Sequence, residues 1–385
     1  MIIAIPKERR PGEARVAASP DTVKKYVGLG FQVVVESGAG DGSSIPDSLY
    51  QEAGATIAAD EAAALKDADV VLKVQRPMAA DEGLDELALM KRGAVLIGTL
   101  AALQNRDQVK AYAEAGVDAF AMELVPRISR AQSMDVLSSQ SNLAGYKAVI
   151  EAANEYTRVF PMMMTAAGTV APAKVLVMGA GVAGLQAIAT AKRLGAVVTA
   201  SDVRPAVREQ VESLGGKFLS VDPEAEKEAE TAGGYAKEMS DDYKKKQREK
   251  VHETLKKTDI AITTALIPGR AAPVLITEEM VKDMKPGSVI VDLAVEAGGN
   301  CPLSKLGKVV TKYGVKIIGY ANMPSRLATD AGALYAKNLL NFLTPLVDKD
   351  TKSLKINWED EIIKGTCLSR DGQVVHAAFA GEGAK

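Results

Sequence analysis

Three glycines in the middle of the chain have a spacing that suits the binding of phosphate groups. Gly179, Gly181 and Gly184 follow an apolar run, 175–178, that is typical of a strand, and from Val182 onwards apolar residues recur at helical spacing. In such a unit the first glycine allows a tight turn, the second lets the backbone approach a pyrophosphate, and the third lets helix and strand pack closely. The N–H groups at the helix N-terminus would face the phosphates. The pattern therefore predicts a strand, turn and helix that bind a dinucleotide.

A carboxylate follows the next expected strand, 196–200, at Asp202. At that place it can accept hydrogen bonds from both ribose hydroxyls of NAD, with Val203 beside it. Arg204 could instead accept the 2′-phosphate of NADP, but Asp202 would repel that phosphate. We therefore expect this site to prefer NAD over NADP.

The sequence of this region allows two other interpretations. The weakly charged run 159–191 could be bound for a membrane, but Pro161, Pro172 and Lys174 interrupt it, and what remains is short for a span and rich in glycine. The glycines could also serve an α/β turn without a ligand. The strand, the helix and the acidic residue in register favour dinucleotide binding.

The composition is that of an ordinary globular protein. Of the 385 residues 47% are hydrophobic and 25% are charged, and the net charge is −2, so no basic excess indicates nucleic acid or an anionic membrane surface. Residues 1–10 predict a strand and not a signal peptide. Cys301 and Cys367 lack metal-ligand spacing and suggest a reducing compartment, and neither His252 nor His376 has a second ligand nearby in the sequence. We expect no metal site.

The elements that would position these residues alternate along the chain, which predicts parallel sheets covered by helices. Expected strands are 2–5, 32–36, 70–74, 94–97, 119–122, 260–263, 288–292 and 315–318, and expected helices are 21–29, 84–91, 106–115, 138–156 and 328–346. The predicted fold class is α/β, with two Rossmann-like domains joined by long helices. One domain would comprise 1–137 plus 328–385, and the NAD(H)-binding domain would comprise 138–327 with its bridging helix.

A strongly charged segment, 222–257, interrupts the second domain. It is either a solvated surface loop and helix or a mobile flap, because Gly233 and Gly234 supply a hinge next to Tyr235. The composition does not decide between the two.

Two short motifs complete the pattern. The methionine run 162–164 is more often hinge or core packing than chemistry. Asp371-Gly372 signals a β-hairpin near the end of the chain.

Several segments resemble one known family over nearly the whole chain. "PKERRPGEARVAASP", "ADVVLKVQRP", the glycine turn and "YANMPS" are similar to the alanine dehydrogenase and pyridine nucleotide transhydrogenase superfamily. Within it, "VPRISRAQSMDVLSSQSNLAGYKAV" and "GGYAKEMSDDY" resemble the NAD(H)-binding component of proton-translocating transhydrogenases, in a version made as a separate chain.

The resemblance also shows a difference from alanine dehydrogenases, which carry a leucine–histidine pair where this chain has Leu100-Ala101. Arg15 and Lys73 match the substrate-binding arginine and lysine of those enzymes. They are ancestral remnants or structural ion-pair partners, and we favour remnants.

The missing histidine distinguishes two reactions. Oxidation of an amine releases protons as well as a hydride, so it needs a positioned base. Direct transfer of hydride from NADH to NADP⁺ moves no proton between the rings and needs two nicotinamides held face to face. The second reaction therefore tolerates Ala101.

The segment 127–135, hereafter the polar loop, is the best candidate for holding the nicotinamide. It offers a cation, an amide and a carboxylate shortly after an expected strand. The resemblance places these around the nicotinamide end of NAD(H), with the glutamine facing the partner nucleotide. The candidate catalytic residues are Arg127, Gln132, Asp135 and Ser138, and Gly234, Tyr235, Gln247 and Leu266 would join the cofactor site. The simpler alternatives are a surface ion pair for Arg127, a helix N-cap for Ser138 and core packing for Leu266.

The function predicted from the sequence is the NAD(H)-binding subunit of a proton-translocating NAD(P) transhydrogenase. NADP(H) would be held on a partner subunit, and a membrane-spanning subunit would translocate protons. We expect a homodimer in the cytoplasm, attached to the inner membrane through these partners. The alternatives are a self-sufficient amino-acid dehydrogenase that uses Lys73 or Asp135 as its base, and an inactive nucleotide-sensing module.

Overall fold

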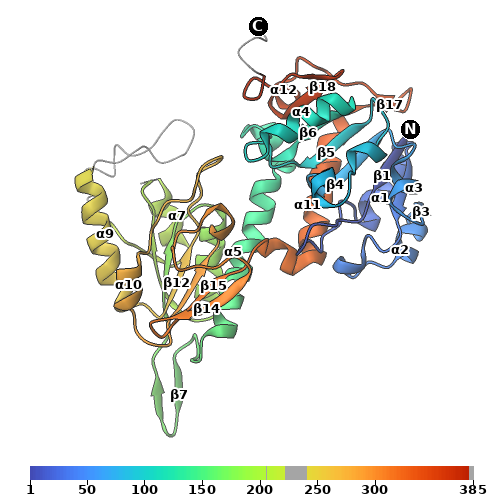
Figure 1. Ribbon diagram of the computed structural model, residues 1–385. Coiled ribbons are helices and arrows are strands. Elements are labelled where there is room, and N and C mark those ends of the chain that lie inside the picture. The colour runs from blue at the N-terminus through green and yellow to red at the C-terminus, as the bar shows by residue number, and fades with distance from the viewer. Residues whose placement is uncertain (205, 222–240, 381–385) are drawn as a thin grey trace. The chain divides into compact units, whose positions relative to one another are not determined.

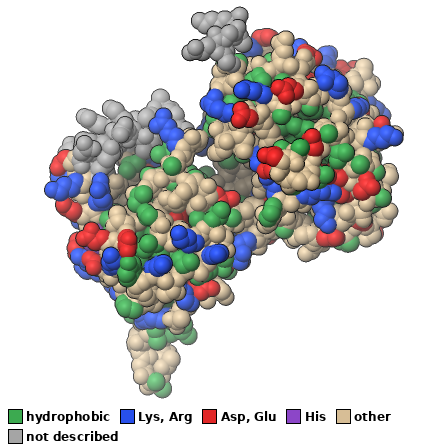
Figure 2. Space-filling view, viewed as in Figure 1, with side chains coloured by type: hydrophobic (Ala, Val, Ile, Leu, Met, Phe, Trp, Pro, Cys, Tyr) green, Lys and Arg blue, Asp and Glu red, His purple; other side chains and the backbone are tan. Residues whose placement is uncertain are grey.

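The computed structural model describes residues 1–204, 206–221 and 241–380 of the chain. The chain divides into two compact units, one comprising Met1–Gln140 with Pro324–Lys385 and the other comprising Ser141–Met323 (Figure 1). Figure 2 shows acidic and basic side chains interspersed on the visible face of each unit, in agreement with the net charge of −2. Within the described ranges, no helix combines the length and the apolar character needed to cross a membrane.

The first unit is built on an eight-stranded sheet in the order β19-β18-β6-β5-β4-β1-β2-β3. The strands are β1 (Ile2–Ile5), β2 (Gln32–Glu36), β3 (Thr56–Ala58), β4 (Val70–Gln75), β5 (Val95–Thr99), β6 (Asp118–Ala121), β18 (Cys367–Arg370) and β19 (Gln373–Val374). The predicted parallel arrangement is confirmed from β3 to β6, whereas β18 and β19 extend the sheet with antiparallel pairs.

The apolar strands of this sheet are buried on both faces. Ile3 and Ile5 of β1 belong to one hydrophobic cluster, and Ala4 between them belongs to another. Such alternation follows from the two-residue period of a strand, and near-continuous apolar runs are expected where helices cover both faces. The helices of this unit are α1 (Pro20–Gly28), α2 (Asp47–Glu52), α3 (Glu61–Leu65), α4 (Arg106–Ala115), α11 (Ala328–Leu343) and α12 (Glu361–Thr366).

The second unit has a seven-stranded sheet in the order β11-β10-β9-β12-β13-β15-β14. Its strands are β9 (Lys174–Met178), β10 (Val197–Ser201), β11 (Lys217–Phe218), β12 (Ile260–Thr263), β13 (Val289–Asp292), β14 (Lys308–Lys312) and β15 (Val315–Gly319), and its helices are α6 (Val182–Arg193), α7 (Val207–Ser213), α9 (Asp241–Leu255) and α10 (Glu278–Lys282). All strands but β14 run parallel. The chain order reverses between β9 and β12, which is the switch point where α/β sheets bind ligands beyond the carboxyl ends of their strands.

The long helix α5 (Val136–Glu155) begins in the first unit and continues into the second. In the second unit it lies directly against the start of α6, because a Cβ added at Gly145 would come within 2.0 Å of the carbonyl oxygen of Ala183. A side chain at position 145 would therefore push α5 away from the glycine turn.

The helix predicted at 84–91 is wrong. The structure has only two short 3₁₀ turns there, Ala80–Glu82 and Leu87–Leu89. The cause is Glu86, which is fully buried, binds the ammonium of Lys73 and accepts from the N–H of Met78. These tertiary contacts hold the segment in turns.

The interpretation of the methionine run as core packing is also wrong. Residues 163–165 form β7 (Met163–Thr165), which pairs with β8 (Gly168–Val170) in a hairpin that extends from the second unit (Figure 1). Met162 and Met164 are 61% and 79% exposed.

The β-hairpin predicted near the end of the chain is confirmed. Asp371 and Gly372 join β18 to β19 with positive φ angles of 50° and 79°, the geometry that a two-residue hairpin turn requires.

Candidate functional site

The glycine turn follows β9 and gives each glycine a separate task. Gly179 has φ +100°, and a Cβ there would lie 2.4 Å from the hydroxyl of Thr264. At Gly184 a Cβ would lie 1.8 Å from the carbonyl oxygen of Gly179, so α6 packs directly on the turn. A Cβ at Gly181 meets only the Arg204 guanidinium, at 3.9 Å. Because Gly181 is the N-cap of α6, the open space lies where an anion would meet the helix N-terminus.

Strand register brings two polar residues to this turn. Met178, the last residue of β9, is level with Ser201 of β10 and with Thr263 of β12. The next residues, Asp202 and Thr264, therefore flank Gly179. The hydroxyl of Thr264 donates to the carbonyl oxygen of Gly179 at 3.1 Å, and Asp202 accepts from the N–H of Ala180 at 2.7 Å.

Asp202 is nearly buried and holds Arg204 through its own carboxylate. One oxygen accepts from the backbone N–H and Nε of Arg204, each at 2.9 Å, and the other accepts from Nη2 at 2.8 Å. The carboxylate thus fixes the guanidinium beside the glycine turn. Val203 lies between these residues and is half-buried. The predicted contact of Asp202 with ribose hydroxyls stays a prediction.

The loop after β12 has an anchor that we did not predict. Asn300 is fully buried, and its amide accepts from the N–H of Ala265 and donates to the carbonyl oxygens of Ala265 and Pro273. Between these anchor points Leu266 is 55% exposed, so the alternative that it is a core residue is wrong. The signal for Asn300 was the pair Gly298-Gly299 before it, which have φ angles of +96° and +85°.

The polar loop lies in the first unit and forms a 3₁₀ helix, Ser129–Met134. Arg127 and Gln132 are exposed. Asp135 accepts from the N–H of Ser138 at 2.9 Å and from its hydroxyl at 2.5 Å. The alternative that Ser138 is the N-cap is therefore wrong, because Asp135 caps α5 and Ser138 lies in the first turn.

Comparison with known proteins decides the family. The model for the N-terminal domain of alanine dehydrogenase/PNT matches residues 4–144, and the model for the C-terminal domain matches 148–377. The chain belongs to the alanine dehydrogenase/PNT family. Members of this family share an α/β fold that implies NAD(H) binding.

Within the family the chain belongs with the transhydrogenase alpha subunits. It is 70% identical over 384 residues, covering 100% of both chains, to the Rhodospirillum rubrum protein named as the first part of NAD(P) transhydrogenase subunit alpha. A solved structure of transhydrogenase from Sinorhizobium meliloti matches with a TM-score of 0.88 and 54% identity, covering 97% of this chain and 100% of that one. Alanine dehydrogenase of Halomonas elongata is 30% identical over 388 residues, covering 99% of this chain and 96% of its own length.

The position at which the resemblance to alanine dehydrogenases predicts a histidine has a left-handed backbone conformation here. Ala101 has φ +48°, and the N–H groups of Leu100 and Ala102 on either side donate to the Glu123 carboxylate, each at 3.0 Å. Burial raises the pKa of Glu123. The loop geometry is thus held by Glu123, and the methyl group of Ala101 can neither accept nor donate a proton.

Arg15 and Lys73 are both bound to carboxylates. The Arg15 guanidinium forms two hydrogen bonds with Glu13, at 2.8 and 2.6 Å, and although burial opposes it, this pairing holds the pKa of Glu13 at about 2. Lys73 is 1% exposed and lies 2.6 Å from Glu86. Burial disfavours its charge, but the neighbouring carboxylates raise its pKa above the ordinary value. The structure therefore shows structural ion-pair partners, where we favoured remnants.

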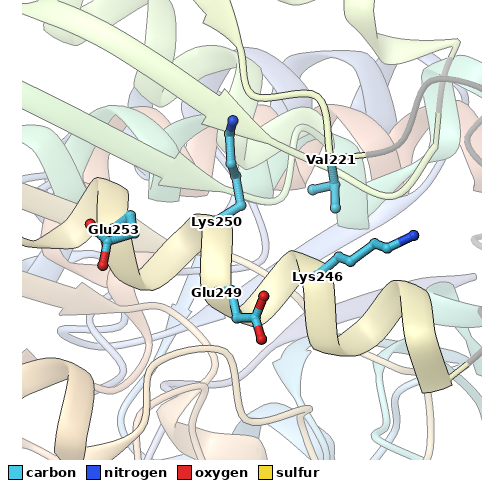
Figure 3. A pocket seen from close by; sticks show the side chains of 5 residues that line it. All are labelled: Val221, Lys246, Glu249, Lys250 and Glu253. Atoms are coloured by element: carbon cyan, nitrogen blue, oxygen red, sulfur yellow. The ribbon is translucent and has the colours of Figure 1, made fainter.

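Of the remaining predicted residues, Gln247 lies on α9. Gln247 is half-buried on this helix, whereas Gly234 and Tyr235 lie outside the described residues. A pocket of about 300 Å³ lies beside the helix, lined by Val221, Lys246, Glu249, Lys250 and Glu253 (Figure 3). Its four charged side chains come from successive turns of α9 and alternate in sign, which is typical of a solvated helix surface.

Proposed function

We propose that the chain is the NAD(H)-binding subunit of a proton-translocating NAD(P) transhydrogenase. The single observation that carries the proposal is Ala101 in place of an acid–base residue, in a chain 70% identical to a transhydrogenase alpha subunit. Hydride would pass from NADH directly to NADP⁺ on a partner subunit.

The residues present fit a bound NAD(H). The positive φ of Gly179 and the open space at Gly181 leave room for a pyrophosphate at the N-terminus of α6. Asp202 would exchange part of its pairing with Arg204 for the ribose hydroxyls, since both groups lie at the same turn. The nicotinamide supplies the hydride, and the protein supplies orientation and electrostatics.

The polar loop would orient the nicotinamide. Asp135 and Ser138 form a rigid polar pair at the start of α5, and Arg127 and Gln132 present exposed polar groups from the same loop. We propose that Gln132 faces the second nucleotide, because its side chain is exposed and uncharged. Reacting carbons would need a separation of roughly 3–3.5 Å.

The rival function, amino-acid oxidation with Lys73 or Asp135 as base, has less support. Lys73 is buried, paired and held in its charged form, so it cannot accept a proton. Asp135 already accepts two hydrogen bonds from Ser138.

Partner subunits would complete the reaction. The name of the Rhodospirillum rubrum relative describes part of one subunit. We propose that an NADP(H)-binding subunit and a membrane-spanning subunit join this chain, and that it is held through them at the cytoplasmic face of the inner membrane. Proton movement through the membrane subunit would drive hydride transfer.

We also propose that the chain is a homodimer and that the β7–β8 hairpin takes part in its interface. An isolated two-stranded hairpin is marginally stable in water, and Met162 and Met164 expose apolar surface on it. Met164→Asp should weaken a dimer seen by analytical ultracentrifugation. A monomeric wild type would contradict the idea.

The function is tested with the purified chain in two assays. With NADH, keto acids and ammonia we expect no oxidation above background. With NADP⁺ and membranes that contain the partner subunits we expect NADH oxidation coupled to NADPH formation. Keto-acid reduction by the isolated chain would instead support the dehydrogenase.

A further inference from the structure

The polar loop is anchored by a helix that carries none of the predicted site residues. Helix α11 packs against the 3₁₀ helix Ser129–Met134 within the first unit. Asn338 lies on the side of α11 that meets the loop and is 8% exposed. A buried amide is expected to have partners for both its donor and its acceptor atoms.

The partners of Asn338 are the direct neighbours of two predicted site residues. Its Nδ2 donates to the carbonyl oxygen of Ser133 at 2.8 Å, and its Oδ1 accepts from the hydroxyl of Ser139 at 2.7 Å. Ser133 follows Gln132 in the chain, and Ser139 follows Ser138. One side chain therefore links the backbone beside Gln132 to the first turn of α5.

Two neighbouring side chains each form a hydrogen bond at one end of this link. Asn341, one turn further along α11, also donates to the carbonyl oxygen of Ser133, at 3.0 Å. Gln140 donates to the hydroxyl of Ser139 at 3.1 Å. Asn338 contacts both the carbonyl oxygen of Ser133 and the hydroxyl of Ser139, so it links the two segments directly.

The loop has apolar anchors on either side of Gln132. Ala131 is 1% exposed and Met134 is 8% exposed, and both belong to the core that contains Tyr335 and Leu339 of α11. The Gln132 side chain is thus displayed from a short segment that is fixed at each end.

We propose that Asn338 is a positioning residue for hydride transfer, acting through the placement of Gln132 and Ser138. The inference rests on the proposed function and deepens it. Nicotinamides must meet within a narrow range of distance and angle, so a small displacement of the loop slows transfer strongly. Binding of NADH through the glycine turn in the second unit would not need this contact.

The test uses three variants of the full chain with its NADP-binding partner. Asn338→Ala removes both bonds. Asn338→Asp has the same size and can still accept from Ser139, but it loses the donor to Ser133. Asn341→Ala is the matched control, since Asn338 still holds Ser133. Single-turnover hydride transfer is followed by stopped flow and NADH affinity by calorimetry, at a temperature where circular dichroism shows every variant folded.

We expect hydride transfer to slow roughly 10–100-fold in both Asn338 variants, with NADH affinity nearly unchanged and Asn341→Ala close to wild type. A rate that stays at the wild-type value in both Asn338 variants would overturn the inference, as would a loss of NADH affinity as large as the loss of rate. A wild-type chain that transfers no hydride would overturn the proposed function and this inference with it, which separates the two failures.

Discussion

Asp202 holds the glycine turn and Arg204 with one carboxylate. It accepts from the N–H of Ala180 and from three groups of Arg204, and we propose that the ribose of NAD(H) binds beside it. The negative charge that would attract ribose hydroxyls would also repel a 2′-phosphate. The Arg204 guanidinium, once freed from its pairing with Asp202, would attract that phosphate.

Replacement of Asp202 by alanine should therefore narrow the preference for NADH over NADPH. We expect NADH affinity to fall roughly ten- to hundredfold, because hydrogen bonds to a charged group contribute about 1.5–3 kcal/mol. Calorimetric titration with both nucleotides measures the difference between the NADH and NADPH affinities. Asp242→Ala on the surface of α9 is the control. Equal affinity of the wild type for NADH and NADPH would refute this role.

Glu8 shows how burial disfavours the ionised form of a carboxyl group in the charge cluster around Lys73. Burial raises its pKa from 4.5 to about 6, against the pull of the Lys73 ammonium, and Glu13 and Glu86 add to the rise. Between these two pH values the folded chain keeps a proton that the unfolded chain has released. The contribution of Glu8 to stability is therefore present below about pH 4.5 and is lost as the pH rises through about 6.

The Glu8 contribution to unfolding free energy falls by about 2 kcal/mol between about pH 4.5 and pH 7, at 1.36 kcal/mol per pKa unit. In Glu8→Gln this fall should be absent, so the unfolding free energy should depend less on pH. The amide keeps an oxygen for the N–H of Val74, which Glu8 binds at 2.6 Å. Urea unfolding across this range measures the slope, with Glu52→Gln at an exposed position as control. An unchanged slope in Glu8→Gln would count against the assignment.

The packing of α5 against the start of α6 fixes the glycine turn from behind. Gly145→Ala would place a methyl group 2.0 Å from the carbonyl oxygen of Ala183. We expect a loss of about 1–3 kcal/mol in unfolding free energy and weaker NADH binding, because the helices must separate. Gly28→Ala is the matched control, since its Cβ would meet nothing within 4 Å. Thermal unfolding and calorimetry measure both effects, and a variant that matches wild type in both would contradict the account.

Elements with a strong local signal could be predicted from the sequence. Strands β1, β2 and β12 and helix α4 agree with the predicted bounds, because their apolar residues follow the strand or helix period. The segment 84–91 could not be predicted, because burial of Glu86 against Lys73 joins residues 13 positions apart. The edge strand β14 was missed as well, since its half-exposed residues give no apolar run.

The residues of the candidate site also fall into those that could be predicted from the sequence and those that could not. The glycine turn and Asp202 could be found from spacing within about thirty residues of sequence. Asn338 could not, because its bond to Ser139 spans 199 positions and gives no local pattern. The sequence allows Ser138 as the N-cap of α5, but the structure shows that Asp135 caps this helix.

In the whole molecule, the predicted cofactor-binding and catalytic residues are divided between the two compact units. The glycine turn and Asp202 belong to Ser141–Met323, and the polar loop belongs to the unit that begins at Met1. Alanine dehydrogenases share this family, but this chain has Ala101 where the sequence resemblance predicts a histidine, and Lys73 is held in a buried ion pair. We therefore propose that the chain takes part in hydride transfer between nucleotides and carries out no acid–base step.

Single-turnover hydride transfer with the NADP-binding partner tests this claim most directly, in the wild type and in Gln132→Asn. The wild type should pass hydride from NADH to NADP⁺ while the isolated chain oxidises no amino acid. The variant shortens one exposed side chain of the polar loop, so it should slow transfer with NADH affinity nearly unchanged, and Gln51→Asn at another exposed position should not. Robust amino-acid dehydrogenase activity in the isolated chain, or full-speed transfer by Gln132→Asn, would contradict the account.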